Sequence, residues 1–148
     1  MHASGLVEEY PLVGIDSDAL DAARILATRR LPGLVVTEES GRPYAILPAS
    51  QVVKFVVPRY IQDDPSLAGV IDESAADRIA ARLVGKTVRD LLPEHPTELP
   101  TVRADDTMLE LAAIMARLRS PLVVVVDDDE IVGVVTASRL LSILGEPL

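Results

Sequence analysis

The sequence predicts a mixed α/β (α+β) fold in which one β-α-β-β-α unit occurs twice, with a helical insert between the two copies. The repeat is visible directly, because segments 11–36 and 100–125 are identical at eleven positions, where composition alone gives about two to four. Within each copy, apolar stripes with the helical period of about 3.6 alternate with short β-branched runs. The 148 residues suffice for one module with a sizeable core.

Each copy opens with a short extended segment that is followed by a helix. We expect the extended segments at Leu12–Ile15 and Thr101–Arg103, and helix-capping residues directly after them at Asp16-Ser17 and Asp105-Asp106. The apolar faces of the two helices comprise Ala19, Ala22, Ala23 and Leu26 in the first copy and Met108, Leu111, Ala112, Met115 and Leu118 in the second.

A hairpin and a second helix complete each copy. In the second copy we expect a strand at Pro121–Val126, buried on both faces, a turn at Asp127–Asp129 and a returning strand at Ile131–Val135. The first copy repeats the hairpin with strands at Leu34–Thr37 and Tyr44–Leu47. The apolar residues of the two closing helices are Val52, Val53, Val56 and Val57, and Ala137, Leu140, Leu141 and Leu144.

The repeat boundaries predict the domain organisation. We expect a first repeat over 1–57, a linker over 58–86 with a helix at 73–83, and a second repeat over 87–148, the whole forming one globular module. A short helical turn is expected at Thr87–Leu92, before the next proline.

Composition argues against several classes of function. The net charge of −9 disfavours nucleic acid or an anionic membrane as partner. The chain has no cysteine, which excludes disulfides, thiolate nucleophiles and cysteine-bound metals. The longest unbroken apolar run, Leu122–Val126, is far shorter than the roughly 20 residues that span a bilayer. Since the first residues also lack the pattern of an export signal, we expect a cytoplasmic protein without membrane insertion.

The sequence offers no recognisable catalytic or metal-binding pattern. Only His2 and His95 are available as imidazoles, and we interpret His95 as a surface residue. The carboxylates of Asp127–Glu130 lack the spacing and the glycine of a calcium loop, so they are interpreted as a turn. Nucleophile elbows, phosphate-binding loops and dinucleotide-binding motifs are absent. We therefore expect no catalytic residues, no metal site and no enzyme activity.

The repeat, with Gly133-Val134-Val135-Thr136 opening the final helix and the stretch Thr87–Leu118 before it, resembles the cystathionine-β-synthase (CBS) domain family. The resemblance covers nearly the whole chain and is weakest over 58–85. It implies a tandem pair, or Bateman module, with the copies related by a pseudo-twofold axis. Clefts between the copies would bind AMP, ADP, ATP or S-adenosylmethionine as a regulatory ligand, with no required cofactor. The resemblance also implies a homodimer formed through the helices.

Thr136 is the first candidate for ligand contact. It stands where a strand turns into a helix, and oriented N–H groups and the helix dipole favour an anion there. The resemblance assigns ligand contact to this threonine, but Thr136 or Ser138 can equally act only as the helix cap. Arg139 occupies the place of the family's ribose-binding aspartate. It can pair with a phosphate through its planar fork, or lie solvated on the helix surface.

The first copy departs further from the family's pattern. Pro48 replaces the threonine and Gln51 replaces the aspartate, with Ser50 as a partial substitute. Loss of a carboxylate that binds ribose predicts affinity weaker by roughly 10- to 100-fold. We therefore expect an asymmetric module with the better site at Thr136. Arg103, after the short strand of the second copy, is a further candidate for phosphate contact.

Two functions remain open from the sequence. The first is a regulatory module whose ligand shifts the packing of the copies and thereby modulates a separate enzyme or transporter. A separate partner is expected because no further domain follows in this sequence. The alternative is a ligand-free scaffold that dimerises through the closing helices. Their apolar residues at 140, 141, 143 and 144 either form a surface that a second chain covers or are used inside the monomer core.

Overall fold

The computed structural model describes residues 1–70, 81–95 and 98–146. Contacts between residues divide the chain into two compact units. Unit 1 comprises residues 1–14, 35–46 and 97–148, and unit 2 comprises residues 15–34 and 47–96. The helix predicted at 73–83 lies outside the described residues except for its last three, which form the 3₁₀ helix η3 (Ala81–Leu83).

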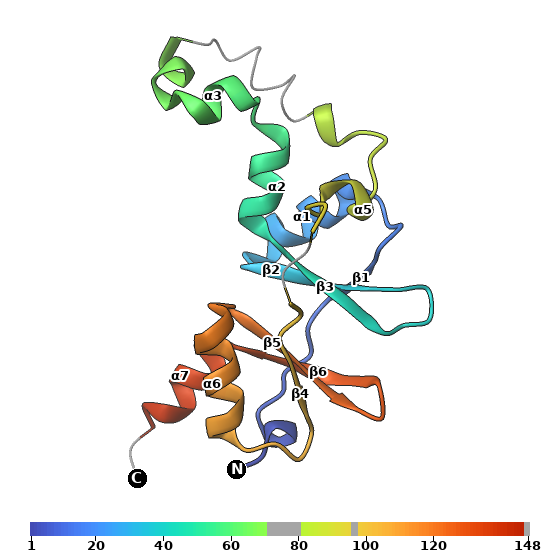
Figure 1. The fold of residues 1–148 in the computed structure, drawn as a ribbon, viewed down its shortest axis with the longest axis vertical. Coiled ribbons are helices and arrows are strands. Elements are labelled where there is room, and N and C mark those ends of the chain that lie inside the picture. The colour runs from blue at the N-terminus through green and yellow to red at the C-terminus, as the bar shows by residue number, and fades with distance from the viewer. Residues whose placement is uncertain (71–80, 96–97, 147–148) are drawn as a thin grey trace. The chain divides into compact units, whose positions relative to one another are not determined.

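The order of helices and strands repeats as predicted (Figure 1). The first copy consists of β1 (Leu12–Gly14), α1 (Ala19–Arg29), β2 (Gly33–Thr37), β3 (Pro43–Pro48) and α2 (Ala49–Val56). The second consists of β4 (Thr101–Arg103), α6 (Met108–Leu118), β5 (Leu122–Asp127), β6 (Glu130–Thr136) and α7 (Ala137–Leu144). Within the described residues, the remaining elements are η1 (Ala3–Gly5) before the first copy, and α3 (Arg59–Asp63), η2 (Pro65–Val70), η3 and α5 (Val88–Leu91) before β4.

Each copy forms a three-stranded sheet, in the orders β1-β2-β3 and β4-β5-β6. The first two strands of each sheet are parallel, with Leu12 opposite Val35 and Thr101 opposite Val124. These pairs occupy equivalent positions in the two copies, so the strand register repeats together with the sequence. β5 and β6 are antiparallel, and the turn Asp128-Asp129 that joins them has φ angles of 49° and 67°. Positive φ at both positions is typical of a type I′ hairpin turn.

The first helix of each copy begins later than predicted. The side chains of Asp18 and Thr107 are the caps, each accepting a hydrogen bond from the N–H three residues further on. The predicted caps at Asp16-Ser17 and Asp105-Asp106 were wrong. Instead, the carboxylate of Asp106 accepts a 2.8 Å hydrogen bond from the N–H of Arg103. The earlier acidic residue therefore closes the turn that precedes the helix.

The helix ends follow from local chemistry. α1 and α6 both end in a left-handed residue, Arg30 with φ 52° and Arg119 with φ 50°, at equivalent positions of the two copies. α2 ends at Val56, so Val57, which was expected in its apolar stripe, is extended. Pro58 explains the difference, because the residue before a proline disfavours helical angles.

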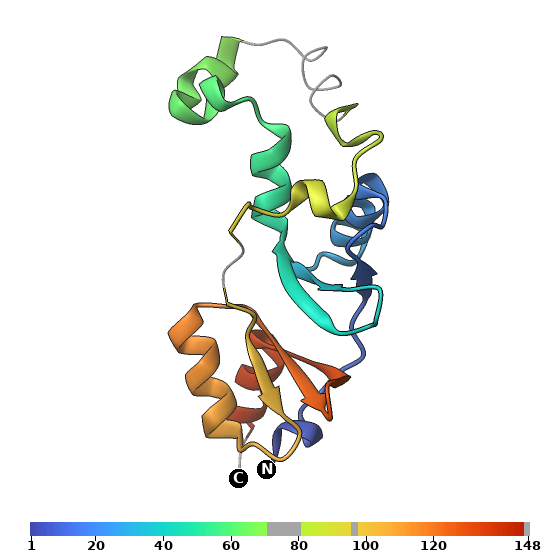
Figure 2. The same ribbon diagram turned by 45° about the vertical axis from the view of Figure 1, so that its right-hand side comes forward.

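The core of unit 1 lies on both faces of the sheet β4-β5-β6. α6 and α7 cover one face, as Figures 1 and 2 show, and pack on Val123 and Val125. On the other face, Leu122 and Val124 pack against Val35 of β2. The four strand residues from 122 to 125 are fully buried, which confirms a strand that is buried on both sides.

The N-terminal segment, residues 1–8, belongs to the same core, a contact that was not predicted from the sequence. The side chains of Ala3 and Leu6 are fully buried among the residues of α6, α7 and the sheet. The N–H of Ala3 donates to the carbonyl of Asp106, and Glu8 forms an antiparallel bridge with Val134 of β6. The segment therefore lies along the outer edge of β6, as an added edge pairing.

The short helix α5 confirms the turn predicted at 87–92. A capping box fixes its start, in which the N–H of Thr87 donates a 2.9 Å hydrogen bond to the Asp90 carboxylate. This hydrogen bond lowers the pKa of Asp90 from its ordinary value.

Candidate functional site

Thr136 lies at the junction of β6 and α7 and caps the helix. Its Oγ1 accepts a 3.0 Å hydrogen bond from the N–H of Arg139, and the N–H of Ala137 donates to the carbonyl of Pro121. The capping role is therefore real, but a hydroxyl that accepts one hydrogen bond can still donate another. Among the described residues, the N–H of Ser138 has no acceptor and is available to an anion.

The Arg139 side chain is not a free, solvated arginine. Its Nε lies 3.8 Å from Oε1 of Glu8, and the two side chains are 36% and 48% exposed. That distance is too long for a hydrogen bond. The Nε atom is itself buried and has no hydrogen-bond acceptor within the described part of the chain. Arg139 thus has a neutralising carboxylate nearby and still an unused donor.

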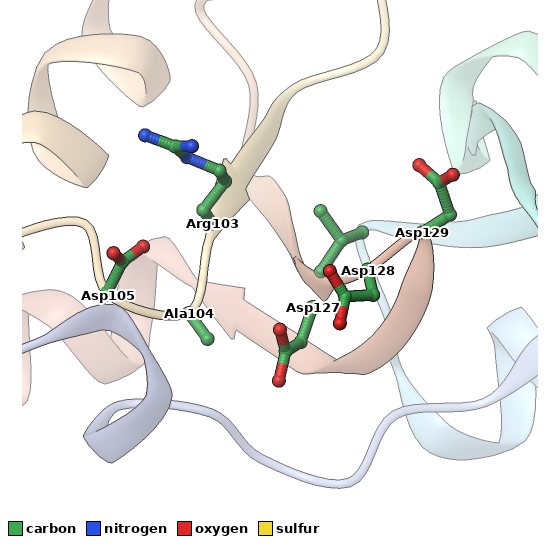
Figure 3. A pocket seen from close by; sticks show the side chains of 7 residues that line it. Arg103, Ala104, Asp105, Asp127, Asp128 and Asp129 are labelled. Atoms are coloured by element: carbon green, nitrogen blue, oxygen red, sulfur yellow. The ribbon is translucent and has the colours of Figure 1, made fainter.

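Arg103 lines a hollow whose lining does not include Thr136 or Arg139. This hollow, of about 600 Å³, lies at the carboxyl ends of β4 and β5 and is lined by Asp105 and the acidic residues 127–129 as well (Figure 3). Four carboxylates beside one exposed guanidinium disfavour a phosphate by like-charge repulsion. No group of residues in the described ranges has the arrangement of a metal site.

The candidates of the first copy belong to unit 2. Ser50 is exposed on α2, and the Gln51 side chain donates a 3.2 Å hydrogen bond to the carbonyl of Leu91. Gln51 also lines a groove of about 510 Å³ together with Lys54 and Arg59. Pro48 precedes α2 without any side-chain capping bond. The two closing helices therefore begin differently, as the replacement of threonine by proline requires.

Of the predicted residues, the structure places Thr136, Ser138 and Arg139 together on the first turn of α7. Arg103 lines a separate hollow. Sequence reasoning missed Glu8, whose carboxylate lies 3.8 Å from the Arg139 Nε. The available signal was the pair of apolar residues at 6 and 7 directly before two glutamates, which suits a short segment with one buried side and one charged end.

Comparison with known proteins decides the family. A family model of the CBS domain matches residues 88–146. A solved structure from Kribbella flavida, of a CBS domain-containing protein of unknown function, is 61% identical. It covers 99% of both chains with a TM-score of 0.89. The chain belongs to the CBS-domain family. Its two copies form a tandem CBS module, as the repeat predicted.

More distant CBS structures share the fold. CBSX2 of Arabidopsis thaliana in complex with AMP is 16% identical, with a TM-score of 0.68 over 97% of this chain and 95% of that one. The CBS domain pair of protein MJ0100, in complex with 5′-methylthioadenosine and S-adenosyl-L-methionine, is 18% identical, with a TM-score of 0.66 over 98% and 96%. A comparison with curated proteins gives no match. Within the described ranges of this CBS-domain protein, every helix is too short or too polar to cross a membrane.

Proposed function

We propose that this CBS-domain protein is a regulatory module that binds an adenosine-containing ligand, such as AMP, ADP, ATP or S-adenosylmethionine, at the first turn of α7. The ligand-bound state would modulate a separate enzyme or transporter. The observation that carries the proposal is the juxtaposition of the Thr136 hydroxyl, the N–H of Ser138 and the Arg139 guanidinium at one strand-to-helix junction. CBS structures of the same fold that hold AMP or S-adenosyl-L-methionine support the ligand class.

Each group has a distinct part in the proposed binding. The Thr136 hydroxyl donates to a ribose or phosphate oxygen while it still accepts from the N–H of Arg139. The N–H of Ser138 and the dipole of α7 favour negative charge at the same place. The planar Arg139 fork suits a phosphate or carboxylate better than a ribose.

Calorimetric titration with AMP, ADP, ATP and S-adenosylmethionine tests the proposal. Thr136→Asp is the informative variant, because aspartate caps a helix at least as well as threonine but places negative charge where the ligand would bind. We expect at least tenfold weaker binding of phosphate ligands with an unchanged circular dichroism spectrum. Ser142→Ala, an exposed position on the same helix, is the matched control. If the folded protein gives no heat with any of these ligands at millimolar concentration, the proposal is wrong.

A ligand-free scaffold is the alternative, and exposed apolar residues on the helices of the second copy favour it. Leu109 on α6 is 77% exposed, and Leu141 and Leu144 on α7 are 66% and 57% exposed. Leu141 and Leu144, spaced i and i+3, share one helix face. A homodimer formed through these helices would cover them. A stable dimer in light scattering, together with no response to any nucleotide, favours the scaffold over the sensor.

A further inference from the structure

Glu8 is held beside the start of α7 by the backbone, not only by its charge. The N–H of Glu8 donates to the carbonyl of Val134 at 2.9 Å, and the N–H of Val134 donates back at 3.3 Å. Val134 precedes the capping Thr136 by two residues on β6. Leu6, fully buried in the core of unit 1, anchors the segment that carries Glu8. The backbone of Glu8 is therefore fixed beside the start of α7, and its carboxylate lies within 3.8 Å of the Arg139 Nε.

The sequence of β6 allows this close approach at one position. A Cβ built on Gly133 would lie 2.7 Å from the Cβ of Val7 and 3.2 Å from the carbonyl oxygen of Glu8. Any side chain at 133 would collide with the N-terminal segment. The corresponding residue of the first copy is Ala45. The glycine that admits Glu8 thus occurs in the copy that also carries Thr136 and Arg139.

The Glu8 carboxylate changes the net charge around a ligand bound at the first turn of α7. Arg139 is the cation on the first turn of α7, and Glu8 Oε1 at 3.8 Å from its Nε partly offsets its charge. The pair does not satisfy the guanidinium, because the buried Nε has no hydrogen-bond acceptor among the described residues. A polyanionic ligand at the same place is repelled by Glu8 more strongly than a neutral one.

Resting on the function proposed above, we propose that Glu8 is a specificity-determining residue of this site. It selects adenosine-containing ligands that carry little negative charge over nucleoside triphosphates. Arg139 is the group through which it acts, since the Glu8 carboxylate competes with ligand phosphate for that guanidinium.

Titration of adenosine and ATP at low ionic strength tests the proposal through a ratio of affinities. Glu8→Gln keeps the size of the side chain and removes its charge. We expect ATP to bind about tenfold more tightly to this variant, as removal of a unit charge within contact distance allows, while adenosine binds unchanged. Glu9→Gln is the matched control, because it changes the net charge equally on an exposed neighbouring residue. Added salt should reduce the gain for ATP.

The outcomes separate the two proposals. An ATP-to-adenosine ratio that moves no further in Glu8→Gln than in Glu9→Gln overturns the role of Glu8 while leaving the ligand site standing. Failure of both ligands to bind the folded wild type overturns the site and the role of Glu8 together. The Arg139→Gln variant provides a second check. In a protein that already carries this substitution, Glu8→Gln should increase the affinity for ATP clearly less than it does in the wild type. An equal gain in both backgrounds contradicts competition for the guanidinium.

Discussion

Substitution of Gly133 by alanine isolates the contact between the N-terminal segment and β6. The added Cβ would meet the Val7 Cβ at 2.7 Å and the Glu8 carbonyl oxygen at 3.2 Å, both of which are backbone or backbone-proximal atoms. The segment must therefore shift away from the strand. The shift strains or breaks the paired hydrogen bonds between Glu8 and Val134 and exposes part of Leu6.

The magnitude follows from these losses. Two backbone hydrogen bonds contribute about 0.5–1.5 kcal/mol each, and full burial of a leucine contributes about 1.5–3 kcal/mol. Partial relaxation of an overpacked site costs about 1–3 kcal/mol, which we take as the expected loss in free energy of unfolding. For a chain of this size each kcal/mol lowers the Tm by about 2–4 °C.

Urea unfolding and amide hydrogen exchange measure the effect. We expect a lower urea midpoint for Gly133→Ala and faster exchange of the Glu8 N–H. Gly5→Ala is the control, because its Cβ would meet only the flexible Met1 side chain at 3.6 Å. Val7→Gly in the Gly133→Ala background removes the colliding atom and should restore part of the loss. Equal stability of Gly133→Ala and Gly5→Ala would refute the reasoning.

Three further predictions concern the turn, the exposed helix face and a titrating cap. Asp129→Gly should raise the free energy of unfolding by about 0.5–1 kcal/mol in urea, because glycine accepts the φ of 67° at no steric cost. Leu141→Lys should shift any dimer towards monomer by about tenfold or more in sedimentation, since the residue is 66% exposed. Asp90→Ala should lower the Tm at pH 7, and the gap to wild type should close as the pH falls below 3.8, because the hydrogen bond from the N–H of Thr87 lowers the pKa of Asp90.

Each of the three predictions has its own control. Asp127→Gly, in a strand position with extended backbone, should destabilise the hairpin, and equal behaviour of the two glycine variants contradicts the turn assignment. Ser142→Lys adds the same charge to α7 without removing an apolar side chain. The contribution of Asp90 is present above the ordinary pKa of 3.8 and lost below it. A Tm gap that does not narrow as the pH falls below 3.8 contradicts the ionised cap.

Local patterns predicted most of the fold because the deciding interactions are local. The strand at 122–125 was predicted from an unbroken apolar run, a leucine followed by three β-branched valines, and the repeat predicts an equivalent strand in the first copy. The exact helix starts were missed because Asp16, Asp18, Asp105 and Thr107 are all capping residues by type. Which one caps depends on the path of the turn, and composition does not carry that information.

Local sequence patterns predicted only part of the candidate site. Thr136 follows from its place between a strand and a helix. The partner of Arg139 does not, because Glu8 comes from the opposite end of the chain and is brought in by edge pairing with β6. The two apolar residues at 6 and 7 are too few to establish a period, so their burial was not predicted.

The seating of the first eight residues on β6 bears on how this protein is dissected. A polypeptide trimmed to the matched region, 88–146, would have a cavity in place of the Leu6 side chain and an unpaired edge along β6. An unpaired strand edge can pair with other chains and so promotes aggregation. The second repeat thus depends on residues 1–8 to complete its core and to pair with its edge strand, so a fragment designed for experiments must contain both segments.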